Sequence, residues 1–157
     1  MKDESVIHRK LAAELFNKTW ELLEMKHRTR EDDLLMVHTA HASRFHWGAA
    51  EAAGVPGTGP LNLERGEWQI SRVYSVIGRP EPALYHANIC LEICKKNNIG
   101  DFDIAFAYEA LARAYAVNGQ RDESNKNMLL ARSAGDAIAK EGDRKYFFSE
   151  LGSIAVK

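Results

Sequence analysis

The chain has 157 residues, of which 45% are hydrophobic, and this size and composition support one domain with one continuous core. Its 21 Lys and Arg residues are balanced by 22 Asp and Glu residues, for a formal net charge of −1. This balance, with no local cluster of Lys and Arg, argues against a surface for polyanions, so nucleic acid is not an expected partner.

The sequence also argues against membrane insertion and disulfide or zinc chemistry. The first ten residues, MKDESVIHRK, lack the apolar core of a secretion signal, and no apolar run approaches the roughly 20 residues that span a membrane. Cys90 and Cys94 are four residues apart on an expected helix, without the spacing of a zinc knuckle or a redox pair. We therefore expect a soluble cytoplasmic protein with no membrane partner, no cofactor and two buried structural cysteines.

Hydrophobic residues recur about every 3.6 residues through nearly all of the chain, which predicts an all-α protein. The first helix is expected over residues 4–27. The second is expected over 30–53, where Thr29 and Asp32 approximate a capping box and Gly54 ends the helix. A loop rich in Gly and Pro then separates this helix pair from the rest of the chain.

Five further helices are expected after the loop, at about 61–77, 82–97, 102–118, 121–140 and 143–152. The whole chain, 1–157, is then a single domain, an α-solenoid of three antiparallel helix pairs with one terminal helix. Its parts are a divergent first pair at 1–53, repeat pairs at 61–97 and 102–140, and the terminal helix at 143–152.

An internal repeat supports this arrangement. The segment ISRVYSVIG at 70–78 matches LARAYAVNG at 111–119, and Arg, Tyr, Val and Gly recur identically. Repeats at this scale indicate stacked units that are each too small to bury their own hydrophobic face.

The spacing of residues within each copy resembles the tetratricopeptide repeat: a small residue, Tyr three later, Gly four after that, and a small residue five further on. The residues that carry the resemblance are Ser71, Tyr74, Gly78, Ala83, Ala87 and Cys90 in the first copy, and Ala112, Tyr115, Gly119, Ser124, Met128 and Ala131 in the second. The resemblance covers about residues 62–140, and the first helix pair follows by analogy. The 41-residue period is longer than the usual repeat of about 34 and implies longer helices.

The resemblance implies a groove lined by the first helix of each pair. The positions that would face a ligand are Arg65, Trp68 and Arg72 in one helix, and Phe106, Glu109 and Arg113 in the other. Each set has i, i+3, i+7 spacing and therefore falls on one helical stripe. The implied function is a non-enzymatic interaction or scaffold module that binds a protein or peptide segment or a small anionic ligand.

In that function the three arginines would supply positive charge and Trp68 an apolar contact. A structural alternative stays open at this stage. Arg72 and Arg113 could instead pair with Glu67 or Glu109 and tie neighbouring repeats together, and Glu109 and Arg113, four residues apart, could satisfy one another. Trp68 would then belong to the core.

The segment HTAHASRFHW at 38–47 suggests a second class of function. His38 and His41 lie three residues apart on one helical face, a spacing found in helical metal sites. A carboxylate, Glu67 or alternatively Glu64 or Glu109, could complete the ligand set. The alternative function is thus a small metal-binding protein or metal-dependent hydrolase. If the repeat extends to the first pair, however, both histidines point inward as hydrogen-bonded packing residues. His8, His27 and His86 are expected to be isolated, at the surface or its boundary.

The C-terminal segment KYFFSELGSIAV supports two interpretations, and no residue is expected to be catalytic. The segment is a candidate contact for a homo-oligomer, because terminal helices of short solenoids often leave an apolar face uncovered. It is equally consistent with a capping helix folded onto its own chain. The apolar residues concerned are Tyr146, Phe147, Phe148, Leu151 and Ile154.

Overall fold

The computed structural model describes residues 2–155, which form seven α-helices and no strand. This confirms the predicted all-α class and the order of the helices. Most boundaries agree with the prediction to within three residues, whereas the sixth helix ends four residues early. The helices are α1 (Lys2–Glu24), α2 (Arg30–Ala52), α3 (Pro60–Val76), α4 (Pro80–Lys96), α5 (Asp101–Val117), α6 (Arg121–Asp136) and α7 (Glu141–Gly152).

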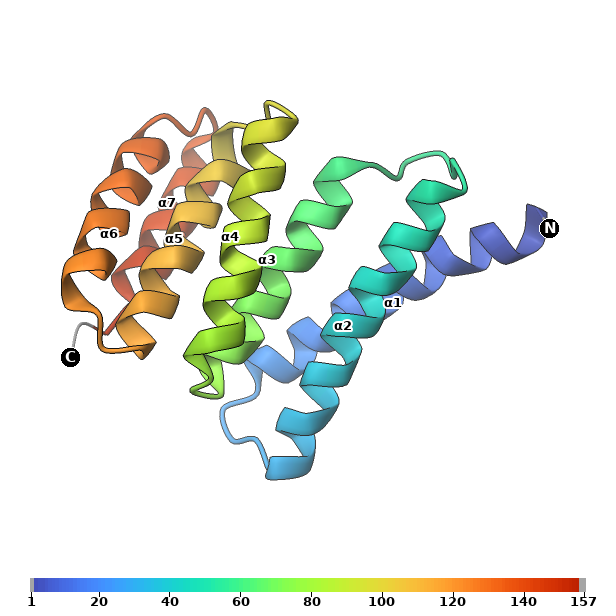
Figure 1. The fold of residues 1–157 in the computed structure, drawn as a ribbon, viewed down its shortest axis with the longest axis horizontal. Coiled ribbons are helices and arrows are strands. Elements are labelled where there is room, and N and C mark those ends of the chain that lie inside the picture. The colour runs from blue at the N-terminus through green and yellow to red at the C-terminus, as the bar shows by residue number, and fades with distance from the viewer. Residues whose placement is uncertain (1, 156–157) are drawn as a thin grey trace.

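Consecutive helices pack as pairs, α1 with α2, α3 with α4 and α5 with α6, and α7 packs against α5 and α6. Figure 1 shows the three helix pairs following one another across the molecule in chain order, with α7 between α5 and α6 in this view, the N-terminus at one end of the stack and the C-terminus near the other. The arrangement is the predicted α-solenoid of antiparallel helix pairs with a terminal helix. Among the helices of the described chain, none is both long enough and apolar enough to span a bilayer.

The first helix pair is joined by a tight, fully capped connection. Thr29 Oγ1 accepts a hydrogen bond from the Asp32 amide at 3.1 Å, and Asp32 Oδ2 accepts one from the Thr29 amide at 2.8 Å, which confirms the capping box. Arg28 Nη1 donates to the carbonyls of Leu23 and Met25, each at 3.4 Å. Because this side chain satisfies carbonyls at the helix end, α1 ends at residue 24 rather than at the predicted 27.

Both copies of the internal repeat end their first helix in the same way. Gly78 and Gly119 adopt left-handed φ values of 73° and 72°, as the repeat predicts. The residue directly after each glycine then donates its amide back to the repeat tyrosine: Arg79 donates to the Tyr74 carbonyl at 2.8 Å, and Gln120 donates to the Tyr115 carbonyl at 3.0 Å. The glycines therefore set the reversal between the paired helices.

The small residues of the repeat lie where the paired helices cross. Ser71 Oγ on α3 donates to the Ala83 carbonyl on α4 at 2.8 Å, and Ser124 Oγ on α6 donates to the Ala112 carbonyl on α5 at 2.9 Å. All four side chains are buried. The two repeats thus use the same contact with Ser and Ala exchanged, so that the hydroxyl comes from the first helix in one and from the second helix in the other.

The C-terminal helix covers the end of the stack. Phe147, Leu151 and Ile154 are buried in the main core of the chain itself, whereas Tyr146 remains 46% exposed. Gly135 on α6 makes room for this packing, because a side chain there would collide with the Phe147 ring. The segment therefore folds as a cap on its own chain, and most of its apolar residues are already used there.

Candidate binding groove

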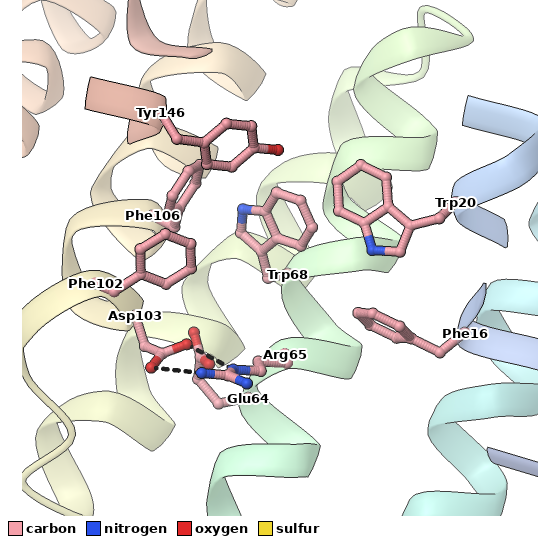
Figure 2. Close-up of a pocket in the computed structure, with 9 residues that line it drawn as sticks. All are labelled: Phe16, Trp20, Glu64, Arg65, Trp68, Phe102, Asp103, Phe106 and Tyr146. Atoms are coloured by element: carbon pink, nitrogen blue, oxygen red, sulfur yellow. Dashed lines mark hydrogen bonds and ion pairs between the residues drawn. The ribbon is translucent and has the colours of Figure 1, made fainter. Parts of the chain in front are cut away.

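A pocket of about 220 Å³ lies on the side of the stack formed by α1, α3, α5 and α7. The first three are the first helices of the helix pairs, which the resemblance to tetratricopeptide repeats predicts along a groove, and α7 is the terminal helix, which that prediction did not include. Figure 2 shows the nine lining side chains converging from these helices. They are Phe16, Trp20, Glu64, Arg65, Trp68, Phe102, Asp103, Phe106 and Tyr146.

Six of the lining residues form what we call the aromatic row, which comprises Phe16, Trp20, Trp68, Phe102, Phe106 and Tyr146. Neighbouring ring centroids are 6.5 Å apart for Phe16 and Trp20, 5.5 Å for Trp20 and Trp68, and 5.7 Å for Trp68 and Phe106. Phe106 in turn contacts Phe102 at 4.6 Å and Tyr146 at 5.9 Å. These separations are typical of favourable aromatic pairs, so the row is continuous across four helices.

One end of the pocket carries an ion pair between α3 and α5. Arg65 Nε donates to Asp103 Oδ1 at 2.8 Å and Arg65 Nη2 donates to Oδ2 at 3.2 Å, a two-point contact between guanidinium and carboxylate. This hydrogen-bonded partner raises the pKa of Arg65. The positive charge that the sequence predicts at Arg65 is therefore present, and Asp103 balances it.

The other two predicted arginines meet at one buried carboxylate. Glu109 is fully buried, and its Oε1 accepts from Arg72 Nη2 at 3.1 Å and from Arg113 Nε at 2.7 Å. Arg72 Nη1 also donates to Glu150 Oε2 on α7 at 2.8 Å. These contacts match the structural alternative that Arg72 and Arg113 pair with Glu109, whereas Glu67 takes no part in them.

Each of the three predicted ligand-binding arginines thus holds a carboxylate of the chain. Arg72 also lies against one of the two indole rings of the pocket, with its Cζ 5.3 Å from the Trp68 ring centroid. Glu109 lies behind this layer and does not line the pocket. The stripe expected to face a ligand is therefore divided: Arg65, Trp68 and Phe106 line the pocket, and Arg72, Glu109 and Arg113 tie α3, α5 and α7 together.

Two polar atoms at the pocket lack a hydrogen-bond partner among the described residues, Glu64 Oε2 and Trp68 Nε1. Glu64 is 1% exposed, and its other oxygen, Oε1, accepts a hydrogen bond from Cys90 Sγ at 2.9 Å. Burial raises the pKa of Glu64 to about 7. Nearly all buried polar groups in proteins are paired, so these two buried atoms are the unsatisfied polar groups of the pocket lining.

A separate polar cluster lies between α2, α3 and α4. His86 Nδ1 and Glu67 Oε2 are 2.6 Å apart, and Arg44 Nε donates to Glu67 Oε1 at 2.8 Å. His41 Nε2 lies 2.8 Å from the Tyr74 hydroxyl. Burial acts to raise the pKa of Glu67, but the hydrogen bond with His86 and the positive charge of Arg44 outweigh it. The pKa of Glu67 is therefore below its usual value. This cluster joins the first helix pair to the second.

The cluster changes the interpretation of the histidines. His41 faces it, whereas His38, one turn earlier on α2, is exposed, so only one of the two points inward. The side chains described, those of residues 4–155, include no group of three or more His, Cys, Asp or Glu that could hold a metal ion, so His38, His41 and Glu67 are not assembled as a metal site.

Two histidines expected to be isolated have partners. His86 lies beside His41, with ring centroids 5.4 Å apart, and pairs with Glu67 as described above. His8 Nδ1 lies 2.7 Å from His46 Nδ1. Both expectations of isolation were wrong, because the partners come from other helices and depend on how those helices align.

No family model matches the chain, and no curated protein or solved structure matches it either. The class of the protein is therefore defined by its own fold and site. It is an all-helical solenoid of antiparallel pairs with an aromatic pocket along its first helices and its terminal helix.

Proposed function

We propose that the protein is a non-enzymatic interaction module of tetratricopeptide-like helix pairs that binds a peptide segment in the aromatic pocket. The observation that carries this proposal is the pocket itself, in which four helices contribute six aromatic side chains and two polar atoms without partners. Large aromatic surfaces dominate the energetics of protein recognition, because they bury much area at little conformational cost. The cytoplasmic location expected from the sequence remains part of this proposal.

The size of the pocket favours a side chain of a longer chain over an independent small molecule. Its volume of about 220 Å³ is below the range of about 300–1,000 Å³ that is usual for drug-sized ligands. The indole N–H of Trp68 has no partner among the described residues and can donate to a peptide carbonyl. A peptide that inserts one side chain and presents its main chain to Trp68 would use both features.

A small anion is less well supported than a peptide. Arg65, Arg72 and Arg113 each pair with a carboxylate of the chain, so an incoming anion would have to compete with Asp103, Glu109 or Glu150. Two of those carboxylates form hydrogen bonds that are at least partly buried, which makes the exchange costly. We therefore retain the peptide and not the small anion.

To test the proposal, peptides are selected from a displayed random library for binding to the purified protein. The affinity of the selected peptides is then measured for the parent and for variants. Tyr146→Ala removes an aromatic side chain that lines the pocket and is 46% exposed. Tyr85→Ala is the matched control, because Tyr85 is 65% exposed on α4 and does not line the pocket. We expect selected peptides to bind the parent and the Tyr85 variant equally, and to bind the Tyr146 variant about tenfold more weakly.

Two results would overturn the proposal. One is a library from which no peptide is enriched. The other is a set of enriched peptides that bind both Tyr146→Ala and Phe16→Ala as tightly as they bind the parent, because such peptides would contact another surface.

A further inference from the structure

The pocket has features that define the side chain it would take, an inference that rests on the proposed function. We propose that the peptide inserts a lysine side chain, with the alkyl stem along the aromatic row and the ammonium group at Glu64. The carbonyl of the same peptide segment then accepts a hydrogen bond from Trp68 Nε1. Each part of this assignment follows from a separate feature of the pocket.

The charges of the pocket favour a cation. The lining contains three side chains of acidic or basic residues, Glu64, Arg65 and Asp103, and Figure 2 shows them together at one end of the pocket. Arg65 and Asp103 cancel one another through their two-point contact. Glu64 is left without a cationic partner, so an ammonium group completes the balance whereas a carboxylate adds a second uncompensated negative charge.

The second oxygen of Glu64, which is buried and unpaired, favours a hydrogen-bond donor. Oε1 is already occupied by the Cys90 thiol, and Oε2 has no partner among the described residues. An ammonium group carries three donors and no acceptor, so it can pair with Oε2 directly. A neutral alkyl side chain would fill the space but leave Glu64 Oε2 without a partner, whereas the peptide carbonyl could still accept from Trp68 Nε1.

The aromatic row suits the rest of a lysine side chain. Its rings offer apolar surface to the methylene groups, and their faces attract a cation through the quadrupole of the π system. Trp68 already shows this behaviour within the chain, because the Arg72 guanidinium lies 5.3 Å from its ring centroid. A side chain that is apolar along its length and cationic at its end therefore matches both parts of the pocket.

Glu64 makes the proposed binding sensitive to pH. Burial raises the pKa of Glu64 to about 7, and the groups that act on it are Arg65 on α3, Cys90 and Cys94 on α4, and Asp103 on α5. Lysine keeps its proton up to a pH of about 10. The attraction between the two groups should therefore strengthen as pH rises through about 7, because only Glu64 changes its charge in this range.

Two matched probes test the assignment on the intact chain. N-acetyl-lysine N-methylamide and N-acetyl-norleucine N-methylamide differ by the ammonium group alone, and their binding can be followed by NMR through the indole N–H signal of Trp68. At about pH 8 we expect the lysine probe to bind at least about fivefold more tightly than the norleucine probe. Its affinity should fall severalfold at about pH 6, and the affinity of the norleucine probe should not change.

Glu64→Gln provides the second measurement. The amide keeps an oxygen that can accept from Cys90 Sγ but removes the charge, so the preference for lysine and its pH dependence should both disappear. If the parent chain binds the norleucine probe as tightly as the lysine probe, or more tightly, the inference is overturned, whatever the variant does. A preference for lysine that survives in Glu64→Gln would overturn it as well.

The outcomes separate this inference from the proposed function. If library peptides bind through Tyr146 but anchor a neutral side chain, the interaction module stands and the lysine assignment fails. If neither the library nor the two probes engage the pocket, both fail.

Discussion

Replacing Glu64 with Gln should stabilise the protein in a way that depends on pH. Burial raises the pKa of Glu64 from 4.5 to about 7, so between these values the folded chain holds a proton that the unfolded chain releases. The free energy of unfolding of the parent therefore falls as pH rises through this interval. At about 1.4 kcal/mol for each unit of pKa, the loss reaches about 3 kcal/mol at and above about pH 7.

The variant should escape this loss because an amide does not ionise. Urea unfolding followed by circular dichroism should give nearly equal free energies for parent and variant at about pH 4.5, and a variant more stable by about 3 kcal/mol at about pH 8. The difference between the two chains removes the contributions of distant histidines and carboxylates. Glu92→Gln, which changes an exposed carboxylate on α4, is the control and should follow the parent at both pH values.

A specific result would refute the reasoning. If Glu64→Gln equals the parent at both pH values, the folded chain carries an ionised Glu64 at no extra cost. The carboxyl would then be stabilised by something other than the contacts described, and the case for a ligand cation at Oε2 would lose its electrostatic basis.

Three further predictions concern packing and charge. Gly135→Ala should lower the free energy of unfolding by about 1–3 kcal/mol in urea titrations, because its Cβ meets an α7 phenylalanine ring, whereas Gly142→Ala, which meets nothing, should not. Arg72→Met should lower the calorimetric stability by about 2 kcal/mol, because buried Glu109 loses a charged donor. Burial lowers the pKa of His46, so this group should offset part of the stability that the parent gains as pH falls below 6.5, and His46→Gln should gain more than the parent in urea titrations over that range.

The fold was predictable because its determinants are local. The 3.6-residue periodicity identifies the helices, and the left-handed glycines at Gly78 and Gly119 mark where the paired helices reverse. The end of α6 was harder to predict. Ile138 continues the apolar pattern of that helix, but its side chain is buried in a non-helical segment that leads into α7. Tertiary burial there prevails over helical periodicity.

The partners of the groove residues were harder to predict than the groove residues themselves. The repeat aligns positions 41 residues apart, but the contacts between α3 and α5 join residues 38 or 37 apart, as in Arg65 with Asp103 and Arg72 with Glu109. The difference is close to one helical turn, so each residue meets the turn before its own equivalent in the next repeat. Pairing the sequence at that offset would have placed Asp103 beside Arg65.

The α1 side of the pocket was missed for a different reason. Phe16 and Trp20 belong to the first helix pair, where the Tyr and Gly positions of the repeat are absent and no alignment fixes the register. Their i, i+4 spacing was the available signal, since it places two large aromatic residues on one face of α1. His86 was missed similarly, because its contact with Glu67 depends on the packing of α4 against α3.

The terminal helix both caps the solenoid and completes the site, and these two roles use different faces. Phe147 and Leu151, four residues apart, are buried against the core. Tyr146 and Glu150, also four apart, point toward α3 and α5, where Glu150 pairs with Arg72 and Tyr146 contacts Phe106. The core contacts therefore fix α7 while the ion pair sets its rotation, and together they hold Tyr146 at the pocket. Because Tyr146 itself carries little of the core packing, Tyr146→Ala should weaken binding without removing the cap.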